Sequence, residues 1–128
     1  MTDTLTLTIP TSEWLSSNQR LHWAQKARRT RSIRTRAFML GLAAIRAGHV
    51  TAHTRKTHVH VLVAYPTARK ADPPNSYPSV KAAIDGLVDA GIFPDDNSDH
   101  VSLGFDRDPE KSALGTYRLT LEMKEIQP

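Results

Sequence analysis

Residues 57–65 read Thr-His-Val-His-Val-Leu-Val-Ala-Tyr, and this stretch decides the fold. Valine recurs at positions 59, 61 and 63, and Tyr65 continues the series. Side chains alternate between the two faces of a strand, so these residues share an apolar face, and His58, His60 and Leu62 lie on the other. The pattern predicts a strand with one face buried.

The segment that follows predicts a helix. In residues 79–90 the apolar side chains recur at the 3.6-residue period, and Gly91 is a natural C-terminal stop. Its apolar stripe consists of Val80, Ile84, Leu87 and Val88. The Pro-rich stretch between strand and helix, residues 66–78, is predicted to be a polar loop.

Further out, the same two periods recur. Thr4–Ile9 alternates as a strand and ends at Pro10, and Lys26 to about Ala47 reads as a long helix. Strand patterns also cover residues 101–105 and 117–123, and residues 106–115 are interpreted as a hairpin loop between them. The order β-α-β-α-β-β predicts one α+β domain over residues 1–128, with two helices packed on a mixed sheet.

The long helix has two unlike halves. Residues 26–36 carry six cations and no acid, and at 100° per residue these cations spread around the helix. The second half is apolar on two sides, with Ile33, Ala37, Leu40 and Ala44 on one and Phe38, Leu42 and Ile45 on the other. We expect the first of these faces to pack on the sheet and the second on another subunit.

The charge is strongly asymmetric. Residues 1–71 hold 12 Lys and Arg against 2 Asp and Glu, whereas residues 72–128 hold 5 against 11. The basic half predicts binding to a polyanion, and the acidic half calls for another role, either metal binding or a solvated surface. With no cysteine, no secretory signal and no apolar run of about 20 residues, we expect a cytoplasmic protein with neither a thiolate zinc site nor a membrane partner.

The acidic half holds the residues suited to chemistry. Asp72 and Asn75 precede the second helix, and the pair Asp95-Asp96 follows it. Oxygen ligands of this kind suit Mg²⁺, although aspartates in loops are more often turn formers. Lys81 stands in the first turn of the helix, where it either pairs with Asp85 or faces a phosphate.

The order of these residues resembles RusA-like Holliday junction resolvases. That family shows a D-x-D-N motif, a lysine opening a helix with a D-x-L-x-x-A-G tail, and a closing D-D pair, and residues 72–96 resemble this signature in the same order. Residues 17–20, Ser-Asn-Gln-Arg, resemble the family's S-N-x-R segment. The resemblance covers most of the chain in order, though only residues 72–96 are highly specific. It implies a homodimeric, Mg²⁺-dependent endonuclease encoded by phages or prophages.

The resemblance also implies site residues. The catalytic set is Asp72, Lys81, Asp95 and Asp96, of which Asp72, Asp95 and Asp96 would bind Mg²⁺, with Mn²⁺ as the alternative ion. The chain departs from the family where Pro74 replaces the second aspartate of D-x-D-N, and where three extra residues precede the lysine. Substitute ligands are Asn75, Asp99 and His100.

The hypothesis is therefore an enzyme that resolves branched double-stranded DNA. Its alternative is a branched-DNA-binding protein that has lost catalysis at Pro74, and a basic interaction module is a third reading. The cations expected to contact the DNA backbone are Arg20, Lys26, Arg28, Arg29, Arg31, Arg34, Arg36, Arg69 and Lys70.

Two smaller patterns leave alternatives open. His58 and His60 share a strand face and could ligate zinc, although a polar face explains them as well. Trp14 and Trp23 are candidates either for stacking on exposed bases or for packing in the core.

Overall fold

The computed structural model describes residues 2–95, 97 and 99–126. The elements are, in chain order, β1 (Thr2–Pro10), α1 (Trp23–Arg46), β2 (Thr57–Ala64), the short 3₁₀-helix η1 (Pro73–Ser76), α2 (Tyr77–Asp89), β3 (Val101–Arg107) and β4 (Thr116–Glu125). The sheet order is β1-β4-β2-β3, in which β2 and β3 run parallel and the other neighbours antiparallel. The predicted α+β class with a mixed sheet and two α-helices is confirmed.

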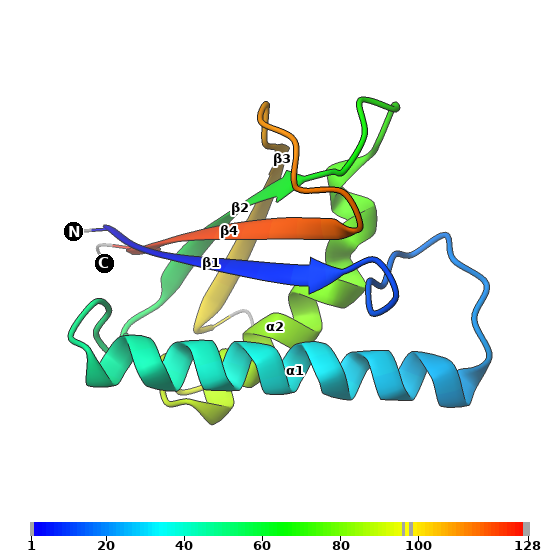
Figure 1. The fold of residues 1–128 in the computed structure, drawn as a ribbon. Helices are drawn as coiled ribbons and strands as arrows, with labels where there is room; N and C mark the ends of the chain where they lie inside the picture. The colour runs from blue at the N-terminus through cyan, green and yellow to red at the C-terminus, as the bar shows by residue number, and fades with distance from the viewer. Residues whose placement is uncertain (1, 96, 98, 127–128) are drawn as a thin grey trace.

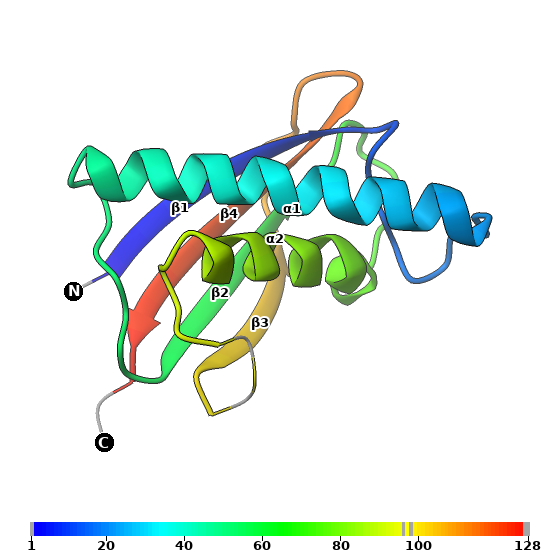
Figure 2. The same ribbon diagram turned by 90° about the horizontal axis from the view of Figure 1, so that it is seen from below.

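Both α-helices cover the same face of the sheet (Figures 1 and 2). The alternation in residues 57–65 is the reason, because Val59, Val61 and Val63 point toward the helices and are fully buried. His58 and His60 lie on the other face and are half-buried. The core thus fills the single layer between sheet and helices.

The two helices approach each other closely. An ideal Cβ built on Gly86 of α2 would lie 2.2 Å from the carbonyl oxygen of Arg34 in α1. On α1, a Cβ at Gly41 would meet side-chain atoms of Ile92 and Leu87 at 3.0 Å and of Ala90 at 3.1 Å. Glycine at position 86 lets the backbones of the two helices pack without a side chain between them.

α1 begins at Trp23, three residues before the predicted start. His22 is its N-cap, and the Nδ1 atom of His22 accepts a hydrogen bond of 3.2 Å from the backbone N–H of Ala24. The basic stretch 26–36 is therefore helical along its whole length.

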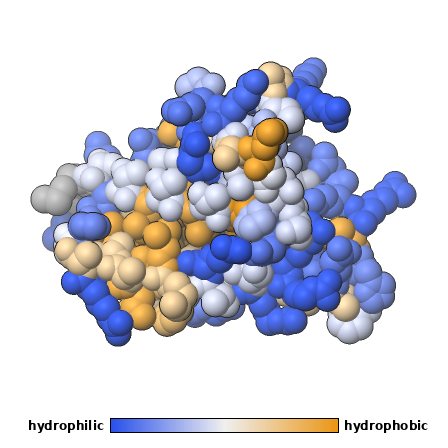
Figure 3. Space-filling view, in the orientation of Figure 1, coloured by the Kyte–Doolittle hydropathy of each residue, from blue (hydrophilic) through white to orange (hydrophobic). Residues whose placement is uncertain are grey.

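The expected second-subunit face of α1 is wrong in part. Ile45 packs against the chain's own core, while Phe38 and Leu42 are half-buried. In the apolar, C-terminal half of α1, the side chain of Met39 is exposed, at 61%. Figure 3 shows hydrophilic residues over the N-terminal half of α1 and apolar colour over its C-terminal half, so the division into two halves is confirmed.

Two loop predictions are wrong. Residues 66–78 end in η1 and the first turn of α2, because proline at the first helical positions needs no N–H partner and has a preset φ. Residues 106–115 do not form a hairpin, since β2 lies between β3 and β4. The segment instead passes the end of β2, where Asp108 and Ser112 donate backbone N–H groups to the carbonyls of Val63 (2.9 Å) and Tyr65 (3.0 Å).

The open face of the sheet is polar. His60 contacts two carboxylates, Asp106 at 2.7 Å from Nε2 and Glu122 at 3.0 Å from Nδ1. The hydrogen bond to Asp106, and then that to Glu122, raises the pKa of His60 above 6.5. His58 pairs separately with Ser102. Among the described residues no group of three or more His, Asp or Glu is placed to hold a metal ion. The interpretation of His58 and His60 as zinc ligands stays a prediction.

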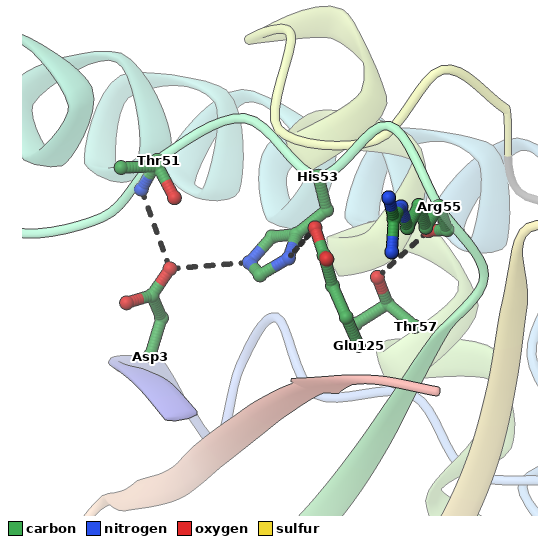
Figure 4. A network of polar contacts seen from close by, with 6 residues as sticks. All are labelled: Asp3, Thr51, His53, Arg55, Thr57 and Glu125. Carbon is green, nitrogen blue, oxygen red and sulfur yellow. Dashed lines mark hydrogen bonds and ion pairs between the residues drawn. The ribbon is translucent and has the colours of Figure 1, made fainter. Parts of the chain in front are cut away.

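A second histidine, His53, contacts the start of β1 and the end of β4 (Figure 4). His53 is 5% exposed, and its ring nitrogens face Asp3 at 3.1 Å and Glu125 at 3.3 Å. Asp3 also accepts the backbone N–H of Thr51. These contacts join the α1–β2 connection to the start of β1 and the end of β4.

An ion pair fixes the segment between β1 and α1. Both carboxylate oxygens of Glu13 accept hydrogen bonds of 2.8 Å from the guanidinium of Arg36. These bonds, together with that from Ser32, lower the pKa of Glu13 from 4.5 to about 2. The carboxylate therefore stabilises the fold fully above pH 4.5, and this contribution is lost as the pH falls toward 2.

We therefore expect Glu13→Gln to lower the free energy of unfolding by about 1 kcal/mol at pH 7, the pair being partly screened by solvent. Near pH 3 the difference from the wild type should shrink, because Glu13 is then largely protonated in the unfolded chain, and part of the stability that its lowered pKa provides is lost. Urea unfolding at the two pH values measures this. An equal loss at both would show that the ion pair does not contribute through its charge.

Candidate functional site

A cleft of about 460 Å³ opens at the edge of the sheet where β1 and β2 end and β4 begins. Two segments far apart in the sequence surround it: the β1–α1 connection, and the loop after β2 with η1, into which that loop leads. Its lining residues are Trp14, Ser16, Asn18, Gln19, Tyr65, Pro66, Thr67, Arg69, Lys70, Ala71, Asp72, Asn75, Ser76 and Tyr117. The cleft therefore brings the Ser-Asn-Gln-Arg segment together with Asp72 and Asn75.

The β1–α1 connection is held to α2 through its backbone. The Ser79 hydroxyl donates to the Leu15 carbonyl at 2.7 Å and accepts the Leu15 N–H at 2.9 Å, and both groups are buried. The backbone N–H of Ser17 donates to the carbonyl of Asn75 at 2.8 Å. Some of the side chains that line the cleft also hold its segments, since Gln19 donates to the carbonyl of Trp14 at 3.2 Å and Ser76 donates to the carbonyl of Pro73 at 2.5 Å.

Arg107, at the end of β3, holds the loop after β2. Its guanidinium donates to the carbonyls of Arg69 at 2.8 Å and Thr67 at 3.0 Å, and lies 4.8 Å from the ring centre of Tyr65. No motif or spacing in the sequence marks Arg107 as a functional residue. It positions the loop that presents Arg69, Lys70 and Asp72.

One wall of the cleft is aromatic. Trp14 stacks on Tyr117 with ring centres 4.1 Å apart, and Tyr65 meets Tyr117 edge-on at 5.8 Å. Burial raises the pKa of the Tyr65 hydroxyl above 10, and the negative charge of Asp72 acts in the same direction. Trp14 is 3% exposed and so belongs to the core, whereas Trp23 is 76% exposed at the start of α1.

The polar side chains of the cleft are available to a ligand. Within the described ranges, the side chains of Arg69, Lys70, Asp72 and Asn75 make no hydrogen bond or ion pair. Two cations thus stand beside a carboxylate and an amide at the mouth of one cleft. Cations attract phosphate, and the two oxygen-bearing side chains are ligands of the type that Mg²⁺ prefers.

Lys81 lies outside this cleft. It forms the expected ion pair with Asp85, at 2.7 Å, and lines a separate hollow beside Ser102 and Leu103 of β3. Both members of the pair also have further interactions. The structure therefore does not bring Lys81 and Asp72 into one pocket.

The acidic loop after α2 is also distant from Asp72. α2 has 13 residues, so its ends are about 20 Å apart, and Asp72 precedes it whereas Asp95 follows it. Asp95 accepts a hydrogen bond of 3.1 Å from Asn97, and Asp99 and His100 also contact Asn97. Asp96 lies outside the described residues. Within the described residues, Asp95, Asp99 and His100 do not line the cleft that holds Asp72.

Three of the six cations in residues 26–36 contact neighbouring segments of the chain. Arg29 donates to the carbonyl of Trp14 at 2.9 Å, Arg34 pairs with Asp89, and Arg36 pairs with Glu13. The side chains of these three arginines contact segments that neighbour α1. Their contacts account for part of the spread of cations around the helix. The remaining candidates of this part have exposed side chains without a hydrogen bond or ion pair to the described chain: Arg20, Lys26, Arg28 and Arg31.

No helix in the described part of the chain is long and apolar enough to cross a membrane. Comparison with models of protein families and with curated proteins finds no match for this chain.

Proposed function

We propose that this protein is a Mg²⁺-dependent endonuclease that binds four-way DNA junctions and nicks them symmetrically, as RusA-like resolvases do. The observation that carries the proposal is the composition of the cleft. Two segments that resemble family motifs, residues 17–20 and 72–75, are about 55 positions apart in sequence and meet there. The cleft adds Arg69 and Lys70, whose charges suit a phosphodiester.

The residues of the cleft fit a divalent ion in chemical type. Mg²⁺ usually keeps several waters and binds one or two carboxylates together with substrate phosphate, and Asp72 and Asn75 offer oxygen atoms of the right kind. A bound Mg²⁺, or Mn²⁺, would polarise the phosphodiester and orient the attacking water. Arg69 and Lys70 would hold the DNA backbone beside Asp72. Lys81 and Asp95 line other surfaces, so the proposal rests first on Asp72.

One observation favours the alternative, a branched-DNA-binding protein without efficient catalysis. Pro74 stands in η1 where the family motif has an aspartate, and proline supplies no side-chain ligand. Within the described residues, Asp72 is the one acidic residue that lines the cleft. A single carboxylate holds Mg²⁺ less firmly than two, so binding without cutting is the second candidate function.

The exposed face of α1 supports a DNA-binding role in either case. Arg28 and Arg31 lie about one helical turn apart on α1. Together with Ser32, Thr35 and Arg36 they line a shallow hollow on its surface. In a homodimer, a two-fold axis would place two such helices and two clefts against a symmetric junction. We propose that the protein acts in this form, in the cytoplasm of a bacterium, on behalf of a phage or prophage.

Replacing Arg28 and Arg31 together with alanine is expected to weaken four-way junction binding by about tenfold at 100 mM salt. The slope of log affinity against log salt concentration should fall by about 1.8, since each phosphate contact contributes about 0.9. Gel-shift titrations at several salt concentrations, with duplex DNA as competitor, measure both quantities.

The matched control is the double variant Arg46→Ala/Arg55→Ala, which removes the same charge at exposed positions away from the N-terminal half of α1. It should bind within about threefold of the wild type. If both double variants weaken binding equally, general charge rather than this face of α1 attracts DNA. A wild-type protein with no preference for junctions over duplex would remove the proposal.

A further inference from the structure

The aromatic wall of the cleft is unexplained by phosphodiester cleavage. Hydrolysis of a phosphate needs charges and oxygen ligands, which Asp72, Arg69 and Lys70 supply. Tyr65 and Tyr117 nevertheless line the same space, partly exposed and braced by Trp14 and by the guanidinium of Arg107. An apolar, planar surface beside a cationic mouth suits a ligand that is both flat and anionic.

The amide groups of the cleft suit the edge of such a ligand. The side-chain amide of Asn75, and the amide nitrogen of Asn18, have no hydrogen-bond partner in the described chain. An asparagine offers a donor and an acceptor side by side, which is the pattern that the edge of a nucleobase presents.

We propose that the cleft takes one unstacked deoxynucleotide of the DNA substrate. Its base would lie against Tyr65 and Tyr117, its polar edge at Asn18 and Asn75, and its phosphate at Arg69 and Lys70. The inference rests on the proposed function and adds a base-recognising pocket to it. The base must leave the helical stack, because a base inside a duplex cannot enter a cleft of this kind.

The size and rigidity of the cleft agree with this assignment. Its volume of about 460 Å³ is that of a small-molecule pocket. The segments that carry Asn18 and Asn75 are joined by the hydrogen bond from Ser17 to the Asn75 carbonyl, and Ser79 fixes Leu15 nearby. Amides on segments already held in place lose little conformational freedom when a base binds.

The test is an NMR titration of the protein with a single-stranded deoxytrinucleotide, following the indole N–H of Trp14. The comparison ligand has the same backbone and phosphates with an abasic central position. We expect the natural trinucleotides to bind about tenfold more tightly than the abasic one for at least one central base. Asn18→Ala should remove most of that difference. Ser17→Ala, a neighbour whose side chain does not line the cleft, should keep it.

Equal affinity for natural and abasic trinucleotides would overturn the proposal, because phosphate alone would then account for binding. A base-dependent gain that Asn18→Ala leaves intact, or that does not shift the Trp14 resonance, would place the base elsewhere and also overturn it. None of these outcomes depends on cutting. The endonuclease proposal fails separately, if four-way junctions are neither preferred nor nicked in Mg²⁺ while trinucleotides still bind.

Discussion

Gly86→Ala is expected to lower the free energy of unfolding by about 3 kcal/mol. The added methyl group would lie 2.2 Å from the Arg34 carbonyl oxygen, 2.8 Å from the Ala37 Cβ and 2.9 Å from the Phe38 nitrogen. All three are backbone or backbone-fixed atoms of α1, so no side-chain rotation relieves the contact. The helices must move apart, and the core between them and the sheet must loosen.

The matched control is Gly41→Ala, at the same helix interface on α1. Its methyl group would meet the ends of Ile92 and Leu87 at 3.0 Å, which can shift, and the Cβ of Ala90 at 3.1 Å, so no contact is as short as the 2.2 Å contact at Gly86. Alanine also favours a helix over glycine by up to about 1 kcal/mol, which offsets part of the crowding. Urea unfolding followed by circular dichroism should show the large loss for Gly86→Ala alone. Equal and small losses would mean that α1 and α2 are not packed as closely as described.

The sequence was sufficient to predict most helices and strands, but it was insufficient to predict which strands pair with each other. Alternation fixes which face of residues 57–65 is buried, and the valines behave as that pattern predicts. Alternation does not say which strand lies beside which. The prediction of a hairpin over residues 106–115 failed for this reason, because β4 instead inserts between β1 and β2.

For the candidate site, the sequence identified several of the polar residues that line the cleft. It did not predict which of the candidates lie close together. Asp72 and Asn75 line one cleft with Ser16, Asn18 and Gln19, a meeting that the order of the motifs did not predict. The length of α2 keeps Asp72 from Asp95, a separation that helix geometry alone already indicates. Arg107 escaped prediction, because its role consists of donating to two backbone carbonyls from a strand far along the chain.

The basic residues of α1 show a related limit. Composition assigned all six cations of residues 26–36 to DNA. The structure gives Arg29, Arg34 and Arg36 partners on neighbouring segments, since a long helix lying on its own domain must anchor the chain on either side. The number of charges in a segment indicates its attraction to a polyanion. It does not show which of the cations form hydrogen bonds or ion pairs within the protein.

Asp72→Asn is expected to reduce nicking of a four-way junction by about 100-fold or more. The amide keeps the size of the side chain and removes its charge, and a metal ion held by that charge contributes several kcal/mol to phosphodiester hydrolysis. Junction affinity should stay within about threefold of the wild type, because backbone contacts dominate binding. Glu110→Gln, an exposed acid that does not line the cleft, is the matched control and should nick at the wild-type rate.

The most direct test of a cutting cleft at Asp72 is a single-turnover nicking assay on a synthetic four-way junction with excess protein and Mg²⁺. We predict paired, symmetric nicks by the wild type and by Glu110→Gln, no nicks in chelator, and the 100-fold loss for Asp72→Asn. If the wild type binds the junction without nicking and Pro74→Asp nicks it, the non-catalytic alternative is correct. Nicking by Asp72→Asn at the wild-type rate would contradict the account.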